Sequence, residues 1–102
     1  MNPKIVRDKI PEIIERSGKT PIYDIVSIDD AIEGLEAKLS EELEEYLADQ
    51  SVEEMADLLE VIHGILFLKG ISWATLEEVR LKKRAERGGF ERRLFLKDVQ
   101  DK

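Results

Sequence analysis

The chain has 102 residues, which is enough for one domain and short enough that burial of a core often depends on assembly with other chains. Hydrophobic residues make up 42% and charged residues 38%, a balance that excludes a disordered chain, and the net charge of −7 argues against a nucleic-acid partner. The absence of cysteine excludes disulfides and thiolate metal sites, and with His63 as the single histidine a metal site needs oxygen ligands, which favours Mg²⁺, Mn²⁺ or Ca²⁺ over Zn²⁺.

The first elements in chain order are predicted to be a short helix and a short strand. Asp8 can cap a helix over roughly residues 9–17, with Pro11 in its first turn and Gly18 just past its end. The segment 20–27, rich in Ile, Tyr and Val, then has the composition of a strand.

Three long helices follow, each with a capping or turn residue at its ends. The first begins after Ser27 or Asp29 and runs to about residue 47 or 48, the second runs from Ser51 to Gly70, and the third from Ser72 to about Arg87. Residues 90–96, after two glycines, are predicted to be a second strand that pairs with residues 22–26. The expected fold is therefore mostly α: an antiparallel bundle of three long helices and a short N-terminal helix, with a small two-stranded β element, in one domain over residues 1–102.

The second long helix is apolar around nearly its whole circumference. A helix of this kind is buried on all sides, and two further long helices of a 102-residue monomer can hardly surround it. We therefore expect a partner chain to complete the bundle, in a homodimer or homotetramer.

Charge is distributed unevenly along the sequence. Eleven acidic residues and one basic residue, Lys38, lie between Glu33 and Glu60, whereas eight basic and two acidic residues lie between Arg80 and Lys97. An acidic middle can bind cations and a basic end can bind phosphates, although charge runs are more often solvated helix faces.

The acidic middle contains two carboxylate pairs at a spacing of three residues. Glu42 and Glu45 fall on one side of the first long helix, next to its apolar stripe, with Glu41 further out. Glu54 and Asp57 share a side of the second helix. Because a short turn makes the helices antiparallel neighbours, the four carboxylates are expected to converge on a Mg²⁺ or Mn²⁺ ion. The alternative is that Glu54 only caps its helix, Asp57 only complements the helix dipole and the others are solvated.

The basic end offers candidate phosphate ligands. Lys83, Arg84 and Arg87 lie on one broad face of the third long helix, and Arg7 and Lys9 add two more cations near the N-terminus. The alternative for the helix is a soluble face with local ion pairs.

Four segments resemble small MazG-like proteins of the all-α NTP pyrophosphatase superfamily, which also contains phosphoribosyl-ATP pyrophosphohydrolases. They occur in the family's order over almost the whole chain: IVRDKIPEII at 5–14, KLSEELEE at 38–45, EEMADLL at 53–59 and KKRAERGGF at 82–90.

The resemblance implies a hydrolase that splits a nucleoside triphosphate into the monophosphate and pyrophosphate. It implies that Glu42, Glu45, Glu54 and Asp57 bind Mg²⁺ and that the protein acts as a dimer or a larger assembly. We expect Glu42 and Glu45 to take part in catalysis, Glu41 to be a further candidate for orienting the attacking water, and the physiological role to be removal of unwanted nucleotides.

Two other functions fit the sequence. One is the sister reaction on phosphoribosyl-ATP, and the other is a non-catalytic helical dimer that binds a nucleotide or a protein. The N-terminus lacks a signal-peptide core and no apolar run reaches membrane-spanning length, so we expect a cytoplasmic protein without a membrane partner.

Overall fold

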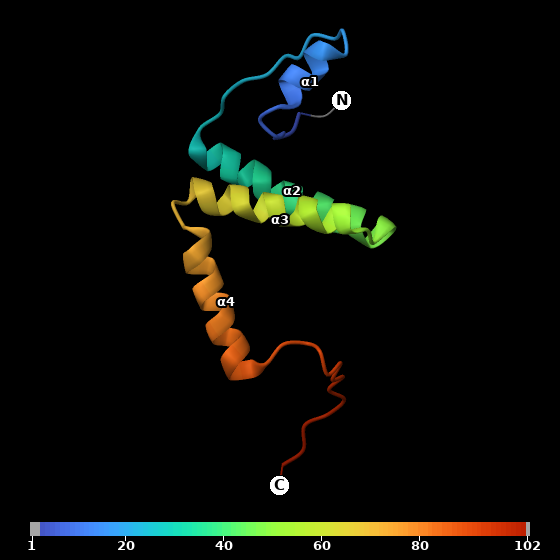
Figure 1. The fold of residues 1–102 in the computed structure, drawn as a ribbon, viewed down its shortest axis with the longest axis vertical. Helices are drawn as coiled ribbons and strands as arrows, with labels where there is room; N and C mark the ends of the chain where they lie inside the picture. Colours follow the sequence, from blue (N-terminus) through green and yellow to red (C-terminus); the bar gives the residue numbers. More distant parts are fainter. Residues whose placement is uncertain (1–2, 102) are drawn as a thin grey trace. The chain divides into compact units, whose positions relative to one another are not determined.

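A computed structural model describes residues 3–101 and shows an all-helical chain. Its helices are α1 (Ile10–Arg16), α2 (Ile28–Asp49), α3 (Val52–Leu68) and α4 (Trp73–Arg87), and this part of the chain contains no strand (Figure 1). The mostly α prediction is confirmed, and the boundaries of the three long helices fall within two residues of those expected. No helix of the described residues has the length and apolar character needed to cross a membrane.

The predicted two-stranded β element is wrong. Residues 20–27 form an extended connection between α1 and α2 without ladder partners, and 90–96 contain only a turn and irregular backbone. Ile22, at the centre of the first segment, is 99% exposed. β-Branched residues favour a strand only when a neighbouring strand supplies hydrogen bonds and packing, and neither segment has such a neighbour among the described residues.

Serine side chains begin the three long helices. Ser27, Ser51 and Ser72 accept hydrogen bonds of 3.1, 3.2 and 3.1 Å from backbone N–H groups three residues later. These bonds satisfy donors that the first helical turn leaves unpaired. In contrast, the predicted Asp8 cap of α1 is wrong, because the residue at the cap position is Lys9 and it makes no side-chain capping bond.

Glycines end α1 and α3 in the same way. Gly18 and Gly70 have φ angles of +88° and +72°, a left-handed conformation that costs glycine little. After α3, the Gly70 and Ile71 amides donate to the carbonyls of Phe67 and Leu66, which is the Schellman pattern of a helix stop.

The helices α2 and α3 form an antiparallel hairpin that positions the candidate site. Gln50 turns the chain in a left-handed conformation, with φ +56°. The two helices then pack along their lengths around the buried Val61. Gly64 permits this approach, since a Cβ there would lie 3.1 Å from the Leu35 side chain. The antiparallel bundle predicted from sequence is confirmed for these two helices.

The chain divides into two compact units, one running to Ile71 and the other beginning at Ser72. The first unit contains α1, α2 and α3. The second contains α4 and the segment after it. In the first unit, apolar side chains of α3 remain exposed on the side away from Val61; these are Val52, Met55, Leu59 and Phe67.

Candidate metal centre

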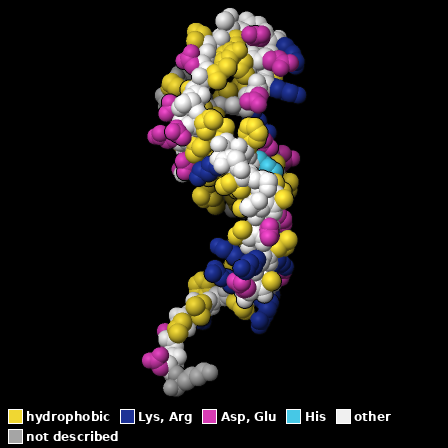
Figure 2. Space-filling model, turned by 90° about the vertical axis from the view of Figure 1, so that its left-hand side faces the viewer, with side chains coloured by type: hydrophobic (Ala, Val, Ile, Leu, Met, Phe, Trp, Pro, Cys, Tyr) yellow, Lys and Arg dark blue, Asp and Glu magenta, His cyan; other side chains and the backbone are white. Residues whose placement is uncertain are grey.

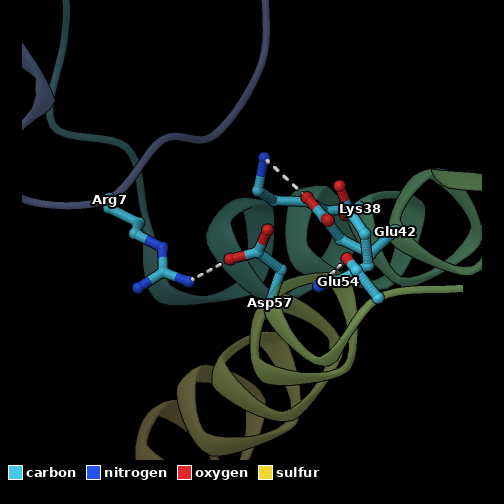
Figure 3. A network of polar contacts seen from close by, with 6 residues as sticks. Arg7, Lys38, Glu42, Glu54 and Asp57 are labelled. Carbon is cyan, nitrogen blue, oxygen red and sulfur yellow. Dashed lines mark hydrogen bonds and ion pairs between the residues drawn. The ribbon is translucent and has the colours of Figure 1, made fainter. Parts of the chain in front are cut away.

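Three carboxylates converge near the turn between α2 and α3. Glu42 comes from the last third of α2, and Glu54 and Asp57 come from the first two turns of α3. Each offers one oxygen, and the three oxygens lie within 4.8 Å of one another (Figure 3). The structure thus brings together three of the four residues predicted as metal ligands. We refer to Glu42, Glu54 and Asp57 as the carboxylate group.

Two oxygens of this group are buried without a hydrogen bond. The Glu42 side chain is almost enclosed, with the residue 6% exposed, and its Oε2 has no partner among the described residues. Oε2 of Glu54 is also buried and has no hydrogen-bond partner among the described residues. A buried carboxylate oxygen without a donor is costly, and such atoms are uncommon in folded proteins. Both oxygens can therefore accept a cation with no hydrogen bond lost.

Burial and mutual repulsion raise the pKa of two members of the group. Removal from water raises the pKa of Glu42 most, followed by the charge of Glu45, while Lys38 opposes the shift. The pKa of Glu54 is raised by desolvation first and then by the charges of Glu45 and Asp57. The cause in both cases is negative charge held in a partly dry space, which a bound dication would offset.

The two other predicted acids lie beside the group. Glu45 is exposed on α2 and close enough for its charge to act on both Glu42 and Glu54. Glu41 is half-buried and lines a cleft with Lys38. Neither residue contributes an oxygen to the converging set. Glu45 therefore lies at the edge of the carboxylate group, and Glu41 lies outside the group.

Two cations partly neutralise the group. Arg7 donates a 2.7 Å hydrogen bond to Asp57 Oδ1, and the Lys38 Nζ lies 3.7 Å from Glu42 Oε1 (Figure 3). Within residues 3–101, Glu54 and Glu45 form no ion pair. Half of the predicted carboxylate quartet therefore has a basic partner within the protein, and the other half has none.

Sequence reasoning missed Lys38 as a member of the site. The signal was present, because Lys38 is the single basic residue of the acidic stretch and precedes Glu42 by four positions, which places both on one helix face. Arg7, predicted as a phosphate ligand, lies on Asp57, whereas Lys9 is exposed at the start of α1.

The basic residues predicted on the third long helix belong to the second unit. Lys83, Arg84 and Arg87 are exposed on the C-terminal half of α4, where Figure 2 shows Lys and Arg side chains gathered. Arg84 donates a 2.5 Å hydrogen bond to Glu91, as the alternative of local ion pairs expects. After the helix, residues 87–94 line a small cleft of about 370 Å³ that includes Arg87.

The donor set fits a hard dication. All available ligands are carboxylate oxygens, two of them are buried and unbonded, and the converging atoms span a distance that one ion can bridge with modest movement of the side chains. Mg²⁺ and Mn²⁺ prefer such ligands, and Mg²⁺ keeps several waters of its own, so three protein oxygens are sufficient.

Comparison with known proteins gives one partial match. A protein of Mycolicibacterium smegmatis described as uncharacterized is 47% identical over 45 residues, which cover 44% of this chain and 46% of that protein. The chain thus matches about half the length of this relative. No family model and no solved structure matches the chain. These comparisons assign no activity, so the function has to be inferred from the carboxylate group.

Proposed function

We propose that the protein is a Mg²⁺-dependent pyrophosphohydrolase that converts a nucleoside triphosphate and water into the monophosphate and pyrophosphate. The observation that carries the proposal is the convergence of Glu42, Glu54 and Asp57 with two buried oxygens that have no hydrogen bond. The resemblance of four segments to MazG-like proteins supplies the reaction class.

Glu42, Glu54 and Asp57 would hold the ion, with Glu45 at the edge of the site. When bound, Mg²⁺, or Mn²⁺ in its place, supplies positive charge that offsets the negative charge of the phosphate oxygens as the anhydride bond breaks. Burial of Glu42 limits water at this point, and a drier site strengthens the attraction between the ion and its carboxylates.

Proton transfer requires an accessible carboxylate next to the reacting centre. Glu45 meets this condition because it is exposed and close enough for its charge to act on both Glu42 and Glu54. It would accept a proton as water attacks the α-phosphorus and the bond to the leaving pyrophosphate breaks. Glu41, which is half-buried on the preceding part of α2, is the second candidate for orienting that water.

Cations would bind the β- and γ-phosphates. Arg7 lies at the carboxylate group and has donors beyond the one it gives to Asp57, so it is better placed than Lys9, the other first-unit candidate predicted from sequence. Lys9, together with Lys83, Arg84 and Arg87 of the second unit, is a further phosphate ligand predicted from sequence. Pyrophosphate is the part of the substrate that these residues would recognise, which leaves selection of the base to other contacts.

A second copy of the chain is the proposed partner of α3. Val52 and Phe67 are 77% and 81% exposed at the two ends of this helix, and Met55 and Leu59 are exposed between them. Covering such side chains stabilises an assembly by about 25 cal/mol for each Å² of apolar surface removed from water. A two-fold axis would place identical faces against each other in a homodimer, and a homotetramer would repeat the contact.

One observation favours a non-catalytic bundle as the second candidate. Arg7 on Asp57 and Lys38 near Glu42 neutralise two of the carboxylates without any metal. If the remaining charge is simply tolerated at the surface, the protein needs no ion and has no reaction to perform.

An assay of pyrophosphate release separates the two candidates. The wild type should release pyrophosphate from one or more canonical or modified nucleotides, or from phosphoribosyl-ATP, only when Mg²⁺ is present. Glu45→Gln should reduce the rate by about 100-fold or more, the usual contribution of a general base. Glu44→Gln, on the neighbouring exposed position, is the matched control. Equal rates for wild type and Glu45→Gln would refute the assigned role, and no release from the whole panel would favour the inert bundle.

A further inference from the structure

A cleft on the first unit lies beside the carboxylate group. It has a volume of about 470 Å³ and is lined by the N-terminal segment and one face of α2. Its lining is formed by Pro3, Lys4, Ile5, Gly34, Ala37, Lys38 and Glu41.

Small residues on α2 create this space. A Cβ at Gly34 would overlap the Ile5 side chain, so glycine lets the N-terminal segment lie directly on the helix. Ala37, three residues later and about one turn further along α2, also lines the cleft, and its small side chain leaves space there. Any larger residue at either position would displace the segment or fill the cleft.

The charge of the lining favours an anion. Two basic residues, Lys4 and Lys38, and one acidic residue, Glu41, line the cleft. The Lys38 side chain is only 17% exposed, and its 3.7 Å separation from Glu42 is too long for a hydrogen bond. Apart from this ion pair with Glu42, Lys38 has no hydrogen-bond or ion-pair partner among the described residues, so its N–H donors remain available to an anion.

Lys38 therefore lies between the carboxylate group and the cleft. On one side it faces Glu42 of the carboxylate group, and it also forms part of the cleft wall. An anion in the cleft would receive the unused donors of Lys38 and those of Lys4. Phosphate oxygens suit this arrangement, because each lysine acts as a compact point charge for them.

We propose that this cleft is a polyphosphate subsite, which binds the pyrophosphate end of the substrate through Lys4 and Lys38. The choice of anion rests on the proposed function, whereas the binding of an anion rests on the cleft alone. The subsite lies on the same unit as the carboxylate group, and it assigns substrate contacts to two lysines that are distinct from the basic residues of α4.

Titration of the full chain with inorganic pyrophosphate, in the presence of a chelator and at fixed ionic strength, tests the subsite. Calorimetry or backbone amide shifts give the dissociation constant, and the amide shifts should be largest at residues 4–5 and 34–41. Lys4→Ala should weaken binding about tenfold because it removes a charge-assisted contact. Ala37→Glu should weaken binding by a similar factor because it adds a negative charge that repels the anion. Lys38→Gln should weaken it similarly, and Lys38→Arg should restore it.

Lys19→Ala is the matched control, because Lys19 is an exposed lysine of the same unit and its removal changes the net charge equally. Lys4 and Ala37 are exposed, so their variants should fold even if a change at Lys38 does not. No binding by the wild type, unchanged binding by Lys4→Ala and Ala37→Glu, or an equal loss in Lys19→Ala would overturn the proposal.

The outcome is separable from that of the proposed function. Cleft-dependent pyrophosphate binding in a protein that hydrolyses no nucleotide would refute the hydrolase and leave the anion subsite standing. If the wild type hydrolyses a nucleotide with Mg²⁺ and all the cleft variants bind pyrophosphate normally in chelator, the subsite alone would be refuted.

Discussion

Arg7 and Asp57, fifty positions apart in the sequence, are joined by a 2.7 Å hydrogen bond that ties the N-terminal segment to α3. The guanidinium occupies one oxygen of a carboxylate that we propose as a metal ligand. It therefore competes with a metal ion for Asp57, because an oxygen that accepts a hydrogen bond from Arg7 binds a metal ion more weakly.

Arg7→Gln should consequently strengthen Mn²⁺ binding by several-fold while changing the stability of the metal-free protein little. Both side chains of the pair are about half exposed, and pairs of this kind contribute about 0–1 kcal/mol. A Mn²⁺ titration and a urea denaturation curve measure the two effects. Arg16→Gln, which removes an exposed Arg–Glu pair within α1, is the control. Equal Mn²⁺ affinities in both variants would contradict competition at Asp57.

Glu54→Gln should raise the melting temperature in chelator and abolish the increase that Mg²⁺ produces in the wild type. The first effect follows because Glu54 is repelled by Glu45, Asp57 and Asp49, and the second because an amide is a poor magnesium ligand. Differential scanning fluorimetry with and without millimolar Mg²⁺ measures both. Glu53→Gln, the exposed neighbour in the same turn, should behave as the wild type. A Mg²⁺ response that survives in Glu54→Gln would remove this residue from the site.

The stability of the protein should depend on pH in opposite ways with and without metal. The folded state raises the pKa of Glu42 above its ordinary value of 4.5, so the native protein binds a proton more readily than the unfolded chain. In chelator, stability should therefore fall as the pH rises from 4.5 through the raised pKa, and the cost of the ionised group is fully present above it. With Mg²⁺, protonation expels the ion, so acid should destabilise over the same range.

Thermal scans between about pH 4 and pH 8 measure this effect. Glu42→Gln should reduce the fall of stability with rising pH in chelator, with Glu54 supplying the part that remains, and Glu44→Gln should leave the fall unchanged. The same dependence on pH in the wild type and in Glu42→Gln, both in chelator, would contradict the burial of an ionised Glu42.

Leu59→Glu and Phe67→Glu should each convert the proposed dimer into monomers at micromolar concentration. Both residues lie on the exposed apolar side of α3, and a buried, unpaired carboxylate at a two-fold interface would be introduced twice. Sedimentation velocity measures the mass. Leu94→Glu, which changes an exposed apolar residue of the C-terminal segment, should remain assembled. A wild type that sediments as a monomer would rule out α3 as a dimer face.

Local sequence rules were sufficient for the helices and for most of the site. Serine caps and glycine stops are interactions within a few residues, so Ser51 and Gly70 identify the ends of α3 without any tertiary information. Spacing on a helix and a tight turn also brought Glu42, Glu54 and Asp57 into the prediction, although the same rules included Glu45, which lies outside the converging set.

The errors concern contacts that are distant in sequence. The bond between Arg7 and Asp57 links segments separated by a helix hairpin, so no periodic pattern contains it. The strand at residues 20–27 was predicted from local composition, although a strand depends on a partner elsewhere in the chain. The Asp8 cap is a separate and local error, because helix α1 begins two residues later, at Ile10, with Lys9 in the cap position.

Electron paramagnetic resonance of Mn²⁺ titrated into the purified chain tests the metal centre most directly, because the signal of free Mn²⁺ disappears on binding and no reaction is required. The wild type should bind Mn²⁺ stoichiometrically, Mg²⁺ should displace it, and Glu42→Gln and Glu54→Gln should each weaken binding by at least tenfold relative to Glu44→Gln and Glu53→Gln. Binding that is weak in the wild type, or equal in all five proteins, would show that Glu42, Glu54 and Asp57 converge without holding an ion.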